Sequence, residues 1–393
     1  MDEQHRREEA VRRYEQGEVP IAIYQSLGRS KAWFFKWVTR AQQDGANWAT
    51  TRSRRPQRSP HRIPPMVERA VIETRKQLEQ RRYAQVGAWS IQWQLRQQGV
   101  PAPSLATINR ILTRHQLVQK SRPYRPKGIP YPTPDIPTSN VLHQFDVLGP
   151  RYLSTDGRFY AANLIDAYDR RCSVNPLRRQ TKIEVTKALL RAWRTLGIPR
   201  YLQLDNQLPF RGSNRYPRSF GLVLRLCLHL GIQPVFIPPR EPWRNGIIER
   251  FQQVFEKGFF RAQPFASFSD LCQEASVFEA FHNQHHRYST LAGQTPEETV
   301  AEPLTVLPDD FRPPKKLTIP PGLIHVVRFI RSTRTLDVFG ETFAMPPEVE
   351  YEYVWSTIDT ANETLSVSHD GQQVEQFVYP LPKTSLDVSR LDL

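Results

Sequence analysis

The pattern of apolar and polar residues divides the chain into a helical first third, a mixed central part and a strand-rich end. Apolar residues recur at helical spacing over residues 6–42 and again over 66–118, which predicts three short helices in each region. From residue 141, alternating runs interchange with helical patterns, which predicts a mixed α/β sheet. Residues 316–380 hold short alternating runs and turn signals such as Asp370-Gly371, which predicts a small β-barrel.

Two proline-rich stretches without periodicity separate these regions. Residues 46–65 combine proline with serine and arginine, and residues 119–140 are proline-dense, so both are predicted to be extended linkers. The predicted organisation is a helical domain at 1–45, a basic linker at 46–65, a second helical domain at 66–120, a proline-rich linker at 121–138, an α/β core at 139–300 and a small β-barrel at 316–382.

The first helical domain has the pattern of a helix-turn-helix. One helix ends at Gly28, and Ser30 is the predicted N-cap of the basic helix that follows. In a helix-turn-helix the last helix reads DNA, while its aromatic residues here are expected in the domain core. The candidates for DNA binding on this helix are Arg29, Ser30, Lys31 and Lys36. Small helical hairpins that bind no DNA have the same pattern, so a purely structural role is the alternative.

The second helical domain follows the same plan. Ser90 is the predicted N-cap of a helix that stops at Gly99, and Ser104 is the predicted cap of the last helix. That last helix has an apolar stripe on one side. The residues that face outward, and are therefore DNA-binding candidates, are Thr107, Asn109 and Arg110.

Nearly all of the positive charge lies in this helical part of the chain. The formal net charge is +15, and residues 1–140 contain 25 Lys and Arg against 11 Asp and Glu. Such a distribution indicates a polyanionic partner, and we expect double-stranded DNA. In the first linker the arginines either neutralise phosphates or belong to a solvated tether; they are Arg52, Arg54, Arg55 and Arg58. A turn-rich stretch at 208–219 adds Arg211 and Arg215 as candidates.

Three acids of the central region are the candidates for catalysis. Asp146 and Asp205 each stand in a short alternating run, at the end of a predicted strand. Glu249 lies at the edge of an apolar helical stripe made by Ile248, Phe251, Phe255 and Phe259. Two strand-borne acids and one helix-borne acid could therefore converge beside a sheet.

Converging carboxylates repel each other unless cations lie between them. Oxygen ligands without cysteine suit Mg²⁺ or Mn²⁺, and two such ions support phosphoryl transfer. We therefore take Asp146, Asp205 and Glu249 as both catalytic and metal-binding candidates for two ions. The alternative is that each is an ordinary solvated acid at a strand end or on a helix.

The sequence around these acids resembles a known family. HQFDVLGP, LQLDN and the run GIQPVFIPPREPWRNGIIERF are similar to the core of DDE transposases and retroviral-type integrases, above all insertion-sequence transposases with an integrase core. Asp146, Asp205 before Asn206, and Glu249 after Asn245-Gly246 stand where the family has its three acids. The likeness covers roughly residues 135–300. With 43 residues between Asp205 and Glu249, the spacing is longer than is usual in the family.

This resemblance implies an RNase H-like fold and divalent-metal-dependent DNA cleavage and joining. It further implies that Asn206, Asn245 and Arg250 position loops or phosphates, and that two tandem helix-turn-helix units read the terminal repeats of an element. The terminal β-barrel is then expected to contact DNA or another subunit, or to pack against the core. Because two DNA ends must be processed together, a homo-multimer on DNA is expected.

Other features narrow the class of protein. The three cysteines, Cys172, Cys227 and Cys272, have no paired spacing, which argues against disulfides and zinc. The charged start and the lack of long apolar runs predict no signal peptide, no membrane partner and a cytoplasmic, nucleoid-associated protein. A tyrosine recombinase is disfavoured because no arginine-histidine-tyrosine constellation of the right kind is found. Two rivals stay open: an inactive DNA-binding regulator derived from a transposase, and a purely hydrolytic nuclease.

Overall fold

The computed structural model describes residues 2–51, 63–118, 129–213, 215–300, 303–389 and 391 of the 393-residue chain. It divides the chain into two compact units, residues 1–64 and 65–393. The predicted linker arginines Arg52, Arg54, Arg55 and Arg58 lie outside the described residues. None of the helices in the described ranges is long and apolar enough to cross a membrane.

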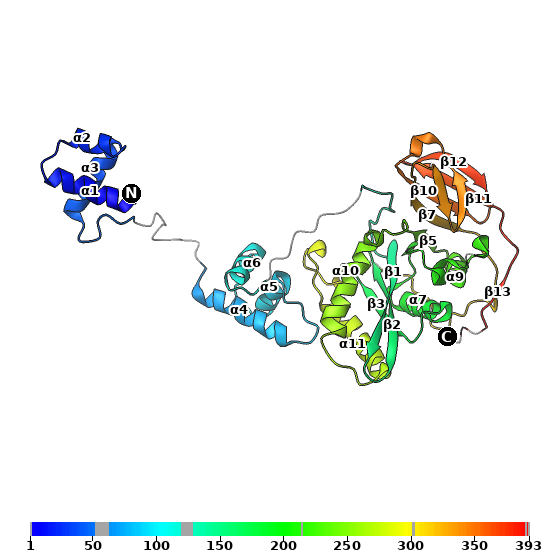
Figure 1. The fold of residues 1–393 in the computed structure, drawn as a ribbon. Coiled ribbons are helices and arrows are strands. Elements are labelled where there is room, and N and C mark those ends of the chain that lie inside the picture. The colour runs from blue at the N-terminus through cyan, green and yellow to red at the C-terminus, as the bar shows by residue number, and fades with distance from the viewer. Residues whose placement is uncertain are drawn as a thin grey trace. The chain divides into compact units, whose positions relative to one another are not determined.

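The first unit is a small bundle of three helices, α1 (Glu3–Glu15), α2 (Pro20–Ser26) and α3 (Lys31–Gln43) (Figure 1). Phe34 and Trp37 are buried in its core, as expected for aromatic residues of the last helix, and Ile23 of α2 packs with them. The predicted cap is confirmed, because the backbone N–H of Trp33 donates to Ser30 Oγ at 3.2 Å. This bundle therefore has an apolar core of its own.

The second unit begins with α4 (Pro65–Gln80), α5 (Ala88–Gln97) and α6 (Leu105–Arg114). Ser104 caps α6 as predicted, accepting from the N–H of Thr107 at 3.3 Å. The prediction that Ser90 caps a helix was wrong, because α5 begins at Ala88 with Gly87 at the N-cap position. The helix extends one half-turn further back than Ser90, since Ala88 and Trp89 are also compatible with helix.

The connector between α4 and α5 is anchored in the aromatic core of the central region. The ring of Tyr83 lies 5.4 Å from that of Phe278 and 5.9 Å from that of Phe259, measured between centroids. Its hydroxyl donates to Glu274 at 2.8 Å. A Cβ added at Gly293 would meet the ring of Trp89 at 2.1 Å, so this approach requires glycine. The second set of helices thus shares its packing with the rest of the unit.

A nine-stranded mixed sheet forms the centre of the second unit, in the order β12-β11-β10-β7-β5-β4-β1-β2-β3. β1, β2 and β3 are antiparallel, whereas β1, β4, β5 and β7 run parallel. The strands are β1 (Leu142–Leu153), β2 (Gly157–Asp166), β3 (Cys172–Leu177), β4 (Tyr201–Leu204), β5 (Gln233–Phe236), β7 (Leu323–Phe329), β10 (Tyr353–Asp359), β11 (Thr364–His369) and β12 (Gln372–Val378). The predicted mixed α/β sheet is therefore present.

Helices cover both faces of the first part of this sheet (Figure 1). α7 (Lys182–Leu196), α8 (Leu208–Arg211) and α9 (Leu222–His229) pack with Phe145 and Leu164 in one apolar cluster. α10 (Gly246–Phe255), the π-turn η3 (Glu256–Phe260) and α11 (Phe268–His285) pack with Phe159 and Ile165 in another. Because neighbouring residues of β2 point to opposite faces, the two clusters lie on opposite sides of the sheet. The helix bearing Glu249 lies on the second of these sides.

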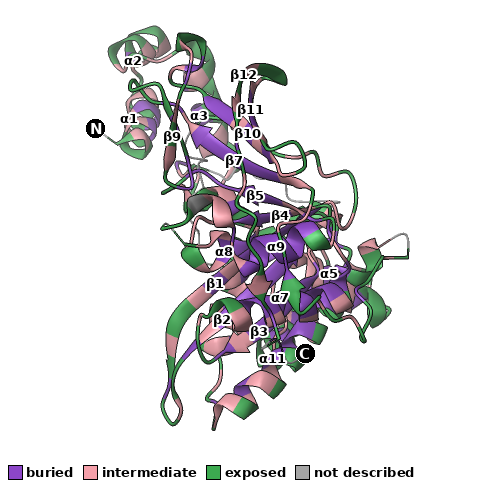
Figure 2. Cartoon of the chain, turned by 90° about the vertical axis from the view of Figure 1, so that its right-hand side faces the viewer, coloured by how far each residue is buried: buried purple, intermediate pink, exposed green. Residues whose placement is uncertain are grey.

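The strands of residues 316–382 do not close into a barrel separate from the core, which corrects the prediction for this region. β7 pairs in parallel with β5, with Val235 opposite His325 and Phe236 opposite Val326, so β7, β10, β11 and β12 continue the core sheet. Figure 2 draws β5 and β7 almost wholly in the buried colour. The apolar cluster that contains Phe145 continues through these strands to Tyr379. An unpaired β5 edge would be costly, and pairing with β7 removes it.

Short elements complete the unit. They are the strand pairs β6 (Lys316–Leu317) with β13 (Leu386–Asp387) and β8 (Thr335–Val338) with β9 (Glu341–Ala344), and the 3₁₀ turns η1 (Pro217–Ser219), η2 (Pro242–Asn245), η4 (Ser289–Leu291), η5 (Glu297–Thr299) and η6 (Pro347–Val349).

Candidate active site

Asp146 and Asp205 occupy corresponding positions on neighbouring parallel strands. The register of β1 and β4 pairs His143 with Leu202 and Gln144 with Gln203. Each aspartate follows its paired glutamine by two residues, so both point to the same face of the sheet. Adjacent strands lie about 4.8 Å apart. The fold therefore brings the first two candidate acids side by side at the carboxyl end of β4.

Glu249 is held against these strands by the two paired glutamines. Gln144 Oε1 accepts from the N–H groups of Ile247 at 3.1 Å and Ile248 at 3.0 Å, in the first turn of α10. Gln203 Nε2 donates to Asn245 Oδ1 at 3.0 Å and to the carbonyl of Arg244 at 3.1 Å. The side chains of Gln144 and Gln203 are buried. The N-terminus of α10 is thus fixed by the strands that carry the aspartates.

The three carboxyl groups influence one another's ionisation. Burial and, to a smaller extent, the charge of Asp146 raise the pKa of Asp205 to about 6. Burial and the charge of Asp146 also raise the pKa of Glu249. The pKa of Asp146 itself is raised by burial, although hydrogen bonds from Gln252 and Val147 oppose that change. All three carboxyl groups therefore resist ionisation and would be stabilised by a nearby cation.

The oxygen donors of this trio suit a hard divalent cation, which binds carboxylates in preference to other side chains. In the part of the chain that the structure describes, however, no three His, Cys, Asp or Glu side chains gather in a group able to hold a metal ion. Asp146 Oδ2 instead accepts from Gln252 Nε2 at 2.8 Å, and Asp205 Oδ2 accepts from Gln207 Nε2 at 2.7 Å. The donor chemistry fits a divalent cation, because each carboxylate has further lone pairs besides the one that the amide uses.

The three predicted accessory residues have different surroundings. Asn245 is buried and donates to the carbonyl of Phe145 at 3.4 Å, one residue before Asp146. Asn206 donates to the carbonyl of Ile237 at 2.7 Å and accepts from Arg328 at 2.7 Å. Arg250 is exposed and donates to Gln253 at 2.9 Å. The two asparagines are parts of the framework, and Arg250 is available at the surface.

The predicted DNA-binding residues of the first unit lie at the start and middle of α3. Lys31 and Lys36 are exposed, with the Lys36 ammonium 5.6 Å from the ring centroid of Trp37. Ser30 is the helix cap, so its hydroxyl already has a partner. Arg29 forms an ion pair with Glu3, so its charge is partly compensated. Lys31 and Lys36 are the residues of this set with exposed charge.

The candidates in the second unit also differ in exposure. Asn109 and Arg110 are exposed on α6, and Thr107 Oγ1 accepts from Arg110 at 3.0 Å. Arg211 is half-buried at the end of α8, and Arg215 is exposed with its guanidinium 5.5 Å from the ring centroid of Tyr216. Neither the α6 residues nor these two arginines form a hydrogen bond with Asp146, Asp205 or Glu249 in the described contacts.

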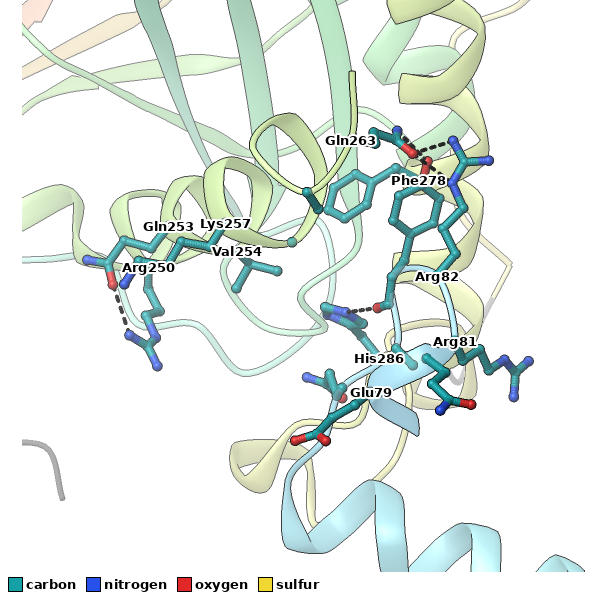
Figure 3. Close-up of a pocket in the computed structure, with 16 residues that line it drawn as sticks. Glu79, Arg81, Arg82, Arg250, Gln253, Val254, Lys257, Gln263, Phe278 and His286 are labelled. Atoms are coloured by element: carbon teal, nitrogen blue, oxygen red, sulfur yellow. Dashed lines mark hydrogen bonds between the residues drawn. The ribbon is translucent and has the colours of Figure 1, made fainter. Parts of the chain in front are cut away.

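A cavity of about 660 Å³ lies between the Tyr83 connector and α10 (Figure 3). Four basic residues line it: Arg81, Arg82, Arg250 and Lys257. Arg82 donates to Gln263 at 2.8 Å and pairs with Glu274, whereas Arg250 bonds only the neutral Gln253 among its described hydrogen bonds. A basic lining of this kind suits a phosphate group.

Sequence reasoning overlooked the glutamines that organise the site. Gln144 and Gln203 hold α10, and Gln207 and Gln252 bond the two aspartates. A signal was present for the first pair, because each precedes its aspartate by two residues and so shares its face of the strand. No local signal indicated that Gln252, one helical turn beyond Glu249, would contact Asp146.

The segment that carries Glu249 matches a known family. Residues 230–296 match the model of an integrase core domain, which spans β5, α10 and α11. The mixed sheet of the chain, flanked by helices, is consistent with an RNase H-like integrase core. The matched stretch contains Glu249 but neither aspartate.

The solved structures to which this chain is similar include viral integrases. The catalytic core domain of HTLV-2 integrase in complex with magnesium, in its dimeric form, is 19% identical, covers 42% of this chain and 97% of that chain, and has a TM-score of 0.32. The intasome of simian T-cell lymphotropic virus in complex with PP2A regulatory subunit B56 gamma is 15% identical, covers 75% of this chain and 95% of that chain, and has a TM-score of 0.37. The search of curated proteins gave no match.

Proposed function

We propose that this protein is a DNA transposase that cleaves DNA at the ends of a mobile element and transfers the strands into target DNA. The observation that carries the proposal is that Asp146 and Asp205 each lie two residues beyond the paired Gln144 and Gln203 of the parallel strands β1 and β4, with the first turn of the Glu249 helix bonded to Gln144. The match of residues 230–296 to an integrase core domain supports the same reading. Transfer of a phosphoryl group between polynucleotides is the reaction class that follows.

Asp146, Asp205 and Glu249 are the residues that would hold two Mg²⁺ or Mn²⁺ ions. When bound, such ions would supply charge stabilisation at the attacking and leaving oxygens of the phosphodiester. The chain itself would supply the positions of these ligands through Gln144, Gln203 and Asn245. Gln252 and Gln207 would orient the two aspartates through their hydrogen bonds, since carboxylates that bind a metal also accept hydrogen bonds.

Binding of double-stranded DNA is assigned to the basic residues outside the trio. Lys31 and Lys36 on α3, and Asn109 and Arg110 on α6, have exposed side chains at the ends of small helical bundles, the arrangement of a helix-turn-helix. Arg250 and Lys257 border a basic cavity next to the helix that bears Glu249. We propose element ends and target DNA as the partners, a homo-multimer as the active form, and the cytoplasm, at the nucleoid, as the location.

A catalytically inactive, DNA-binding regulator is the second candidate. It is favoured by one observation: among the described residues, no three metal-binding side chains gather in one group. In such a protein the helical bundles would bind DNA and the acids would remain bonded to Gln252 and Gln207. Catalysis therefore has to be measured directly.

The test uses purified protein, supercoiled plasmid carrying the flanking repeats, and Mn²⁺, with Asp146→Asn and Glu249→Gln as variants. We expect nicked and joined products from the parent and none from either variant, with DNA binding equal in all three. Cleavage without joined products would indicate a nuclease. A parent that binds the plasmid but never cleaves it would favour the regulator, and cleavage that persists in both variants would refute the site.

A further inference from the structure

Arg328 of β7 reaches from the C-terminal strands to the segment that follows Asp205. Its guanidinium donates to Asn206 Oδ1 at 2.7 Å and to the carbonyl of Ile237 at 3.2 Å. It also donates to the carbonyl of Asp337 at 2.9 Å. The residue is only 5% exposed. Since a buried guanidinium must satisfy its donors, Arg328 fixes Asn206 firmly in place.

Tyr353 of β10 makes the matching contact with the segment that precedes Glu249. Its hydroxyl donates to Glu241 Oε1 at 2.7 Å, and Glu241 in turn accepts from Arg244 Nε at 2.9 Å. The guanidinium of Arg244 lies 5.0 Å from the ring centroid of Tyr353 and 4.2 Å from that of Tyr131. The carbonyl of Arg244 accepts from Gln203. The loop that leads into α10 is therefore held from the C-terminal strands on one side and from β4 on the other.

We propose that Arg328 and Tyr353 are positioning residues of the active site, through which strands β7 and β10 set the distance between Asp205 and Glu249. The inference rests on the proposed function and adds to it a role for the C-terminal strands in the chemical step, in place of a role confined to DNA or subunit contacts. Neither side chain is expected to touch DNA. Each acts through a segment that it holds: residues 205–207 for Arg328 and 241–245 for Tyr353.

Small displacements of such segments are sufficient to slow a reaction strongly. A misplacement of about 1 Å at a reacting centre can cost about 100-fold in rate. Arg328→Met keeps a side chain of similar length but removes all the N–H donors of the guanidinium. Arg328→Lys keeps a positive charge on an ammonium group but lacks the planar fork of the guanidinium. Tyr353→Phe keeps the ring that packs on Arg244 and removes the hydroxyl, which donates to Glu241 and accepts from Arg244 at 3.1 Å.

The chain offers a matched control in Arg225. This residue is also fully buried and donates to backbone carbonyls, those of Ser219, Phe220, Leu317 and Thr384. It joins α9 to the last part of the chain but contacts neither the Asn206 segment nor the Glu241 loop in the described contacts. Arg225→Met thus reproduces the loss of a buried guanidinium without disturbing the two segments of interest.

The experiment uses the full chain and two readouts. Hydrogen exchange is measured on peptides covering 203–209 and 239–247, and single-turnover cleavage is measured at saturating DNA with Mn²⁺. We expect faster exchange of the first peptide in Arg328→Met and of the second in Tyr353→Phe. The cleavage rate should fall about 100-fold in Arg328→Met and about tenfold in Tyr353→Phe, and should recover in part in Arg328→Lys. DNA affinity should stay within about twofold of the parent in all three variants. Arg225→Met should leave both peptides and the rate of the folded protein unchanged.

Several results would overturn the inference. Unchanged exchange in both peptides, or unchanged cleavage despite faster exchange, would show that the two residues do not position the acids. An equal loss of rate in Arg225→Met would show a general loss of stability instead. If the parent cleaves and both variants cleave equally well, only this inference fails. If the parent binds DNA but never cleaves, the proposed function fails and the catalytic role of both residues fails with it.

Discussion

The first helical bundle and the C-terminal strands were both predicted to be separate domains, but only the bundle has an apolar core of its own. The bundle of residues 2–51 is closed around its own core of Ile23, Phe34 and Trp37. The C-terminal strands instead extend the central sheet, and their apolar residues join the cluster that contains Phe145. One region is a unit with an apolar core of its own, and the other shares the core of the central sheet.

The difference arises from which side chains cross the boundary. His325 on β7 bonds Gln233 on β5 at 2.8 Å, and Arg328 and Tyr353 bond the segments around the candidate acids. In the first bundle the buried Arg7 bonds the carbonyl of Ala49 at 2.7 Å, within the same unit. The buried polar groups of the first bundle find their partners inside the bundle. Those of the C-terminal strands find their partners across the boundary that was predicted between the core and the C-terminal domain. An unsatisfied buried group is costly, so such contacts make the two regions fold together.

The largest effect that we expect comes from removing each region in turn. A chain of residues 65–393 should unfold cooperatively at nearly the temperature of the corresponding transition in the full chain. A chain that ends at residue 315 exposes the β5 edge and the apolar face under β7, a loss comparable with the whole stability of about 5 to 15 kcal/mol of a folded domain. Differential scanning calorimetry checks both. A stable, cooperatively folded 1–315 chain would show that the C-terminal strands are a separate module after all.

A smaller effect is expected from Gln144→Ala, which leaves the N–H groups of Ile247 and Ile248 without their partner. Burial of these unpaired groups should cost about 2 to 4 kcal/mol in the free energy of unfolding. Because α10 carries Glu249, cleavage by the folded variant should fall at least about tenfold. The matched control is Gln92→Ala, another buried glutamine, which donates to the carbonyl of Pro103 at 2.8 Å. An equal loss of cleavage in both variants would contradict the special role of Gln144.

The raised pKa of Asp205 predicts how stability depends on pH in the presence of EDTA. The folded state holds the proton up to a pH of about 6, whereas the unfolded chain loses it near pH 4. The folded state therefore binds more protons in this window, and stability must fall as the pH rises from about 4 to about 6. Asp205→Asn lacks this fall and should be more stable at pH 7 by up to about 3 kcal/mol. Denaturant unfolding at pH 4 and pH 7 tests this, and equal pH dependence of both proteins would contradict it.

The smallest change in stability is expected in the first bundle. Lys31→Ala and Lys36→Ala alter exposed side chains and should change the free energy of unfolding by less than about 0.5 kcal/mol. Each variant should weaken DNA binding several-fold. The slope of the logarithm of the binding constant against the logarithm of the salt concentration should become less steep by about 1. Lys383→Ala, an exposed lysine of the C-terminal part, serves as the control and should change neither. Binding that is unaffected by both bundle variants would remove α3 from the DNA interface.

Local pattern was sufficient to predict the elements that carry the candidate site. The strand around Asp146, the strand before Asp205 and the helix of Glu249 follow from alternation and helical stripes, because burial of one face dictates that periodicity. Caps at Ser30 and Ser104 followed from side chains that bond the first turn of their own helix. These are interactions between residues close in sequence.

What the sequence did not reveal depends on pairs far apart in the chain. Arg328 with Asn206, and Tyr353 with Glu241, are separated by more than one hundred residues. The pairing of β5 with β7 is of the same kind, so an alternating pattern could not distinguish a closed barrel from an extended sheet. The misplaced cap at Ser90 is a smaller error, since a helix start is uncertain by one or two residues.

We propose that Asp146, Asp205 and Glu249 form one site for a divalent cation. Mn²⁺ binding followed by electron paramagnetic resonance at pH 7 tests this on the parent and on Asp146→Asn, Asp205→Asn and Glu249→Gln. We expect the parent to bind Mn²⁺ and each variant, folded to the same extent, to bind it at least about tenfold more weakly. Equal binding by the parent and all three variants would contradict the proposed site, because the cation would then lie elsewhere in the chain.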